Sequence, residues 1–231
     1  MPVPVKEIEQ PGFWRGLRDT PVTVVLLASL LMVYAFTSYQ SADAIHNVSG
    51  SWLASQLWLE PARPCTALCL PRVVGAPLLA FGPLNLIFGG SALLVVGRQL
   101  EGHMGSERFL VAYLVAACGS AMAVALFKPH AVTRGPEAVV LGLSAILVII
   151  ALRARIRFRF TGLFVLLILG YFAAVFTAST SFVSFVGGCV ACCLLAWPLL
   201  AWRRTARQSF VGVFLTVLGF ATWLSPSLVA H

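Results

Sequence analysis

One carboxylate of this chain comes directly before a long apolar stretch, where a buried helix is expected to begin. The tripeptide Gly135-Pro136-Glu137 precedes residues 138–152, which are almost wholly apolar. Glycine is tolerated at a helix N-cap, proline suits the first turn, and an acidic side chain complements the positive end of the helix dipole. An ionisable group inside a membrane span is also a candidate functional group. Glu137 is therefore either the carboxylate of a helix start, hydrated or paired with Arg134, or a polar anchor in a ligand cavity.

Asn85 presents the same choice in an earlier apolar stretch. In lipid, an amide side chain can form a hydrogen bond between helices, and it can also line a cavity. Ser184 lies near one end of a later apolar stretch and is close enough to that surface to join such a cavity. We keep four residues as candidate cavity and binding residues: Asn85, Glu137, Arg134 and Ser184.

Hydroxyl groups are the other side chains that could do chemistry, but no serine has a histidine at helical spacing. Acyl transfer needs a nucleophile activated by a nearby base, together with an oxyanion stabiliser. Ser144, Ser181 and Ser184 lie in or beside apolar stretches, where serine usually bonds back to a backbone carbonyl or packs as a small residue. The histidines all fall in loops or at the terminus: His46, His103, His130 and His231. A displaced serine dyad stays an alternative that the sequence does not support.

Two of the six cysteines lie outside the apolar stretches. Cys65 and Cys69 are four residues apart and are flanked by prolines. An oxidising outer compartment would favour a disulfide between them, although one helical turn leaves their Cα atoms near the upper limit for bridging. Neither histidines nor carboxylates cluster around them, so we expect no metal site, and nothing in the chain indicates a cofactor. The other four cysteines are expected to pack as small apolar residues: Cys118, Cys189, Cys192 and Cys193.

The elements that must position these residues are membrane helices. The chain has 231 residues, of which 59% are hydrophobic and 10% charged. A helix of about 20 apolar residues crosses a hydrocarbon core of about 30 Å. Short polar breaks separate seven apolar stretches: residues 21–39, 76–97, 109–127, 138–152, 161–179, 182–202 and 210–229. We therefore predict an all-α membrane protein whose residues 1–231 form a single transmembrane domain.

Basic residues predict the orientation, because they mark the cytoplasmic ends of membrane helices. A cytoplasmic N-terminal segment, residues 1–20, places residues 40–75 outside as an interfacial loop. It places residues 203–231 as a cytoplasmic turn and a seventh span that ends outside. Twelve of the 16 basic residues then lie inside: Lys6, Arg15, Arg18, Arg98, Arg108, Arg153, Arg155, Arg157, Arg159, Arg203, Arg204 and Arg207.

This orientation also explains the net charge of +8 without a nucleic-acid partner. The basic residues form short clusters at membrane boundaries, where they attract anionic lipid headgroups. The run from Arg153 to Arg159 alternates arginine with apolar residues and is typical of an interfacial turn whose side chains snorkel. It is also a candidate lipid-headgroup site, formed by Arg153, Arg155, Arg157 and Arg159.

The fourth stretch is too short to cross the membrane from surface to surface. Its 15 residues span about 22 Å at 1.5 Å per residue, and Arg153 fixes its inner end. Its outer end, with Glu137, is therefore expected below the outer surface. Irregular backbone at that depth is tolerated only where protein covers it or water fills a cavity. We expect a water-accessible indentation that opens to the outside.

These features resemble the rhomboid intramembrane serine proteases. The segment 85–109 is similar to their second span and following loop, residues 135–143 to their short fourth helix, and residues 185–188 to the His-x-Gly-Gly of their sixth span. The long outer loop with tryptophan also fits. The matching residues of the second span and loop are Asn85, Gly97, Arg98, Glu101, Gly105 and Ser106. The resemblance implies a bundle of six transmembrane helices, here with a seventh C-terminal span and a cytoplasmic N-terminus.

The catalytic positions of that family are not retained. The resemblance puts Glu137, or Pro136 or Ala138 if the register slips, where the nucleophilic serine stands, and it puts Phe185 where the histidine base stands. Phe81 holds a third histidine position, four residues before Asn85, which is itself retained. The chain therefore looks like a catalytically inactive member of the superfamily, a pseudoprotease.

Inactive relatives bind membrane-protein segments through the same fold. The resemblance therefore implies a protein that binds, stabilises or routes a membrane-protein client, or that serves as a subunit of a membrane complex. The alternatives are an intramembrane serine protease with a displaced dyad and a lipid-handling protein that uses the outer cavity. Membrane lipids and a membrane protein are the expected partners. Short loops favour a bacterial plasma (inner) membrane as the location of this multi-pass protein.

Overall fold

The computed structural model describes residues 19–41, 51–58, 69–80, 82–127, 130, 135–154 and 182–201. All regular structure in these ranges is helical. The helices are α2 (Pro21–Ser41), α3 (Trp52–Leu57), α4 (Cys69–Gly75), the 3-10 turn η2 (Ala76–Leu78), α5 (Pro83–Met104), α6 (Ser106–Phe127), α7 (Glu137–Ala154) and α9 (Phe182–Ala201).

Four of the predicted apolar stretches are helices close to their predicted bounds. Residues 21–39, 109–127, 138–152 and 182–202 correspond to α2, α6, α7 and α9. Of the described helices, Pro21–Ser41 and Ser106–Phe127 are long and apolar enough to cross a membrane, and the bent pair Arg72–Leu78 and Pro83–Met104 would make a third span. The stretches 161–179 and 210–229 lie outside the described residues. The count of seven spans and the cytoplasmic N-terminus therefore stay predictions.

The predicted stretch 76–97 was wrong at both ends. Residues 76–78 form η2, and α5 begins only at Pro83, whose missing N–H and fixed φ suit the first turn of a helix. The short helical segment before this break and α5 make an angle of 106°. At its other end α5 continues beyond Gly97 to Met104, because the side chain of Glu101 is held inside the bundle. The helix thus lies about two turns further toward the C-terminus than predicted.

The predicted outer loop, residues 40–75, contains two short helices in its described parts. Ser51 caps α3 by accepting a hydrogen bond from the amide of Ala54, at 3.0 Å. Trp52 is 67% exposed, as expected for a side chain at a headgroup layer. Arg72 of α4 donates its Nε–H to the carbonyl of Gln56 at 3.2 Å, and this bond ties the two short helices together.

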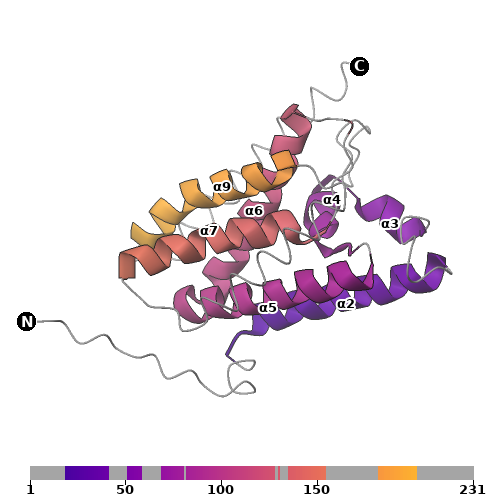
Figure 1. The fold of residues 1–231 in the computed structure, drawn as a ribbon, viewed down its shortest axis with the longest axis horizontal. Helices are drawn as coiled ribbons and strands as arrows, with labels where there is room; N and C mark the ends of the chain where they lie inside the picture. Colours follow the sequence, from indigo (N-terminus) through magenta and orange to yellow (C-terminus); the bar gives the residue numbers. More distant parts are fainter. Residues whose placement is uncertain are drawn as a thin grey trace, which may run out of the picture.

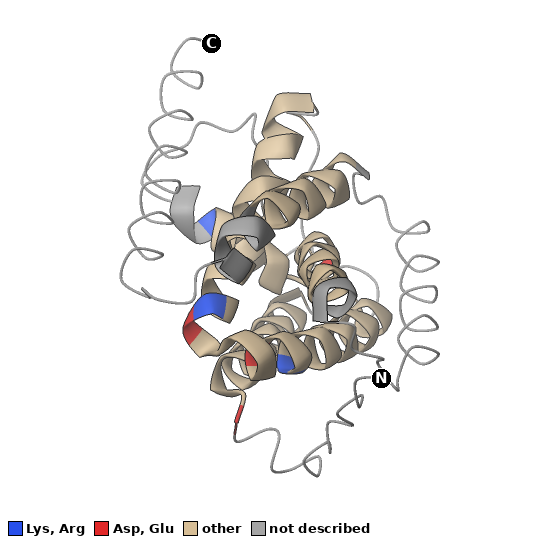
Figure 2. Cartoon of the chain, turned by 90° about the vertical axis from the view of Figure 1, so that its left-hand side faces the viewer, with Lys and Arg blue, Asp and Glu red and all other residues tan. Residues whose placement is uncertain are grey.

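The helices pack as two neighbouring pairs with α6 across them. Figure 1 shows α9 alongside α7, α2 alongside α5, and α6 passing behind. The core runs from Leu100 and Phe109 near the α5–α6 junction to Leu143 and Ile146 of α7, and all four side chains are fully buried. Figure 2 shows that Lys, Arg, Asp and Glu occupy few positions on the described helices.

Small residues allow α9 to approach its neighbours closely. A Cβ atom added at Gly187 would lie 2.3 Å from the Cβ of Ala123 and 2.5 Å from the carbonyl oxygen of Gly119, both on α6. One added at Gly188 would lie 2.7 Å from the carbonyl oxygen of Ala138 on α7. In lipid, helices associate through such close van der Waals packing. This packing fixes the position of α9, and with it Phe185, against the start of α7.

Candidate functional site

The start of α7 is a buried turn held by two backbone hydrogen bonds. Gly135 adopts φ +101°, a conformation open to glycine, and its amide donates to the carbonyl of Ala76 at 2.9 Å. The amide of Val140 donates to the carbonyl of Pro136, also at 2.9 Å. All residues from 135 to 140 are buried. Protein therefore covers the helix start, and the water-accessible indentation that we expected around Glu137 is not seen there.

Glu137 is paired with Asn85 of α5. The Asn85 Nδ2–H group donates a hydrogen bond to Oε1 of Glu137, and the Glu137 side chain is 1% exposed. Glu137 Oε2 and Asn85 Oδ1 are buried and have no hydrogen-bond donor among the described residues. The sequence left each of these two residues with a choice between a structural role and a role in a cavity. The structure joins them in one site, and their hydrogen bond connects α5 with α7.

Close packing positions this pair. Asn85 and Gly89 are one turn apart and lie on the same face of α5. A Cβ atom added at Gly89 would lie 2.5 Å from Cγ of Pro136, so the absence of a side chain brings α5 directly against the start of α7. The Glu137 carboxylate folds back over Gly135, where an added Cβ would lie 1.9 Å from Oε2. Glycine at both positions is what allows the carboxylate to reach Asn85.

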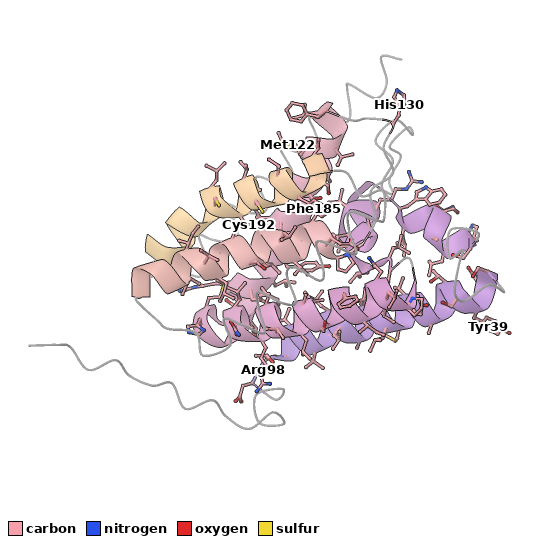
Figure 3. The ribbon with its side chains drawn as sticks, viewed as in Figure 1. Tyr39, Arg98, Met122, His130, Phe185 and Cys192 are labelled. Carbon is pink, nitrogen blue, oxygen red and sulfur yellow. The ribbon has the colours of Figure 1, made fainter. Side chains whose placement is uncertain are left out.

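Phe185 provides an apolar wall beside the pair. Its side chain is 7% exposed and forms a cluster with Ala138 of α7, together with the partly buried Phe88 and Leu141. Figure 3 labels Phe185 on α9, and it shows His130 away from Phe185, toward the upper right of the view. A phenyl ring can neither accept nor donate a proton, so this position supplies no general base.

Two of the serines considered as nucleophiles, Ser144 and Ser184, form hydrogen bonds within the bundle. Ser144 donates to the carbonyl of Val140 at 2.7 Å, the back-bonding expected for serine in a span. Ser184 is hydrogen-bonded to Ser120 of α6, and both side chains are buried. Ser184 therefore joins α9 to α6, and no described hydrogen bond connects it to the Asn85–Glu137 pair. His103 lies at the inner end of α5, where Nδ1 is 2.7 Å from the carbonyl oxygen of Gln99.

A second buried carboxylate, Glu101, joins three helices at the other end of the bundle. Its Oε1 accepts from the amide of Val22 at 2.9 Å and from Oγ of Ser106 at 2.6 Å. Its Oε2 accepts from the amide of Thr23 at 2.8 Å and from Thr23 Oγ1 at 2.7 Å. Glu101 thus caps the free amides of α2 and links α2, α5 and the start of α6.

Sequence reasoning identified Glu101 only as a match to a family motif and gave it no role. The signal that could have found it is the set of capping residues at two helix starts. Thr23 and Ser106 can each donate a hydroxyl, and the first amides of α2 need an acceptor. Nothing in the local pattern says that the acceptor comes from a residue 78 positions away.

Several predicted site residues lie outside the described residues: Arg134, Phe81, Cys65, Arg155, Arg157 and Arg159. Cys69 begins α4 and Arg153 lies in the last turn of α7, but the description does not extend to their side chains. The disulfide and the lipid-headgroup site therefore stay predictions. In the part of the chain that the structure describes, no three His, Cys, Asp or Glu residues are grouped so that they could hold a metal ion.

Comparison with known families gives one match. Residues 69–202 match the family described as the Rhomboid domain, and they make up more than half of the chain. The match begins at α4 and ends one residue beyond α9, so it includes Glu101, Asn85, Glu137 and Phe185. No curated protein matches the chain.

Proposed function

Because the chain belongs to the rhomboid family, we propose that it is a rhomboid-like membrane protein without protease activity that binds a membrane-protein client. Binding stabilises or routes that client, or holds this chain as a subunit of a larger membrane complex. The family and the apolar helices make the chain an integral membrane protein. We place it in a bacterial plasma membrane, with lipids and a membrane protein as its partners and with no role in binding nucleic acid.

The proposal rests on the residues at two positions. The resemblance puts Glu137 and the buried Phe185 where a protease needs serine and histidine. A serine protease must transfer a proton from the nucleophile to a base. Glu137 is hydrogen-bonded to Asn85 and has no hydroxyl to attack a peptide bond, while Phe185 packs against Ala138. This supports a site that recognises a group without reacting with it.

The engaged hydroxyls argue against a displaced serine dyad. Ser144 and Ser184 are each hydrogen-bonded within the bundle, and the two described histidines, His103 and His130, lie at the inner end of α5 and in an exposed loop position. A serine is a strong nucleophile only when a base takes its proton. These contacts favour the binding function over the protease.

Two measurements on the purified full-length chain test the proposal. A serine-directed fluorophosphonate probe and a reporter transmembrane substrate should give no labelling and no cleavage, with an active rhomboid protease as the positive control. Extraction in mild detergent should retain a membrane protein in stoichiometric amount. Cleavage that disappears in the Ser184→Ala variant would establish the displaced dyad and reject the proposal. Recovery of lipid alone, with no bound protein, would favour lipid handling.

A further inference from the structure

The Asn85–Glu137 pair presents two buried oxygen atoms that lack a donor. Asn85 Nδ2 and Glu137 Oε1 satisfy each other, but Asn85 Oδ1 and Glu137 Oε2 have no hydrogen-bond donor among the described residues. An unsatisfied buried acceptor costs about 1–3 kcal/mol, and a charged one costs more. Buried acceptors without donors are rare in native proteins and call for an explanation. A ligand that brings donors would satisfy both atoms at once.

The chemistry of the two atoms selects the kind of ligand. Both are acceptors, and one belongs to a carboxyl group, so their complement is a group that only donates and carries positive charge. The ammonium of lysine and the guanidinium of arginine have donors and no acceptor. Ionisable residues within membrane spans are typically paired with one another, often on different helices. No described basic residue fills this role for Glu137, whose described side-chain partner is Asn85.

The position of the pair favours a long side chain that arrives from the lipid. Leu84 and Ile87 of α5 are strongly exposed, at 68% and 62%, and lie on one side of the helix, about 100–160° around its axis from Asn85. Asn85 is partly exposed, and its partner Glu137 is 1% exposed. A client helix against the exposed side would need a side chain that reaches around α5 to the pair. Lysine and arginine have the long apolar stems that allow a charged end to extend away from its own backbone.

We propose that the membrane client carries a lysine or arginine in its transmembrane segment, and that this side chain binds Asn85 Oδ1 and Glu137 Oε2. The inference rests on the proposed client-binding function and adds the chemical class of the client. The apolar cluster of Phe185, Phe88, Ala138 and Leu141 lowers the local dielectric and strengthens the ion pair. The site thereby selects clients by a basic residue in a segment that is otherwise apolar.

The experiment uses three single-span peptides that differ at one position in the outer third of the span, where they carry Lys, Leu or Glu. Each is mixed with the full-length protein in phosphatidylcholine vesicles, and binding is followed by energy transfer between labels. The Lys peptide should bind at least about tenfold more tightly than the Leu peptide, as expected of a desolvated ion pair. The Glu peptide should bind more weakly than the Leu peptide.

Glu137→Gln should abolish the preference for Lys, because it removes the charge and keeps the shape. Glu107→Gln changes an exposed carboxylate on α6 and should leave the preference intact. The three-peptide comparison on the unmodified protein stands even if the Glu137 variant fails to fold.

Equal binding of the Lys and Leu peptides would overturn the inference, as would a preference that survives Glu137→Gln. A preference for Lys that is absent from the unmodified protein and appears only in Arg134→Ala would identify Arg134 as the resident partner, and one that vanishes when phosphatidylethanolamine is added would identify a lipid ammonium as the occupant. Either result also rejects a client lysine. A native client that stays bound but has no basic residue in its span would refute this inference and leave the proposed function standing.

Discussion

Replacement of Glu101 by glutamine should destabilise the bundle, because the two carboxylate oxygens serve two different helix starts. Oε1 accepts from the Val22 amide and Ser106, and Oε2 accepts from the amide and hydroxyl of Thr23. Glutamine keeps one oxygen and puts an NH₂ group in place of the other. A hydroxyl can turn to accept from that group, but a backbone N–H cannot. One buried amide is therefore left without an acceptor whichever way the side chain lies, at a cost of about 1–3 kcal/mol.

The assay is thermal unfolding in mild detergent with a dye that fluoresces when it reacts with thiols. Cys192 of α9 is fully buried where α9 packs against α6, so its thiol becomes reactive when the bundle opens. For a chain of this length, a loss of about 1–3 kcal/mol lowers Tm by roughly 2–12 °C. Glu101→Ala removes both oxygens and should cost roughly twice as much, because two amides then lack acceptors.

Glu107→Gln is the matched control, since Glu107 is exposed and lies in the first turn of α6. It should change Tm by little more than the error of the measurement, because surface substitutions usually stay within about 0.5 kcal/mol. If Glu101→Gln melts at the same temperature as Glu107→Gln, the network around Glu101 contributes nothing to stability. The reasoning from orphaned amides would then be wrong.

Three further predictions address packing, the turn before α7, and topology. Gly187→Ala should cost about 1–3 kcal/mol of stability in the same melting assay, because the added Cβ meets α6. Gly102→Ala is the control and should be neutral or stabilising, since nothing lies within 4 Å of its added Cβ. Equal effects of the two variants would contradict the close crossing of α9 and α6. Gly135→Ala should lower Tm further than Gly102→Ala, since φ +101° strains any side chain and the new Cβ meets the Glu137 carboxylate; an unchanged Tm would count against this turn. A cysteine at Arg155 should resist an impermeant maleimide in intact cells and react after permeabilisation; labelling in intact cells would reverse the orientation.

The length and composition of the apolar stretches were sufficient to predict most of the long helices. They failed to predict the start of α5, which a proline decides. The starts of α2, α7 and α9 follow from where apolar residues begin, because a membrane span must satisfy its backbone internally and so becomes a helix. The start of α5 was misplaced, because residues 76–82 are as apolar as the helix that follows. Pro83 decides that boundary, and its effect depends on the turn that η2 makes before it.

The residues of the candidate site could be predicted from the sequence, but their burial and hydrogen-bond partners could not. The motif around Gly135 and Glu137 identifies a helix start, and the resemblance to rhomboid proteases singles out Asn85 and Phe185. The expected wet indentation is not seen around Glu137 in the part of the chain that the structure describes, because Gly89 of α5 and Phe185 of α9 pack closely against the start of α7. Arg134, the candidate partner that neighbours Glu137 in sequence, lies outside the described residues, and the partner that the structure describes, Asn85, is 52 residues away.

The sequence by itself determined that this protein is a helical membrane protein of the rhomboid family, and its resemblance to rhomboid proteases predicts that serine and histidine are missing from the two catalytic positions. These properties follow from local composition, from the length of apolar stretches and from residues at motif positions. Only the tertiary structure decided that Asn85 donates a hydrogen bond to one of the two carboxylate oxygens of Glu137. It also decided that Ser184 is hydrogen-bonded to Ser120 and that Glu101 holds three helices together. The physical reason is that a buried polar group must find its partner in three dimensions. The partner lies on whichever helix packs against it, and packing is settled by small residues and volumes that leave no periodic pattern in the chain.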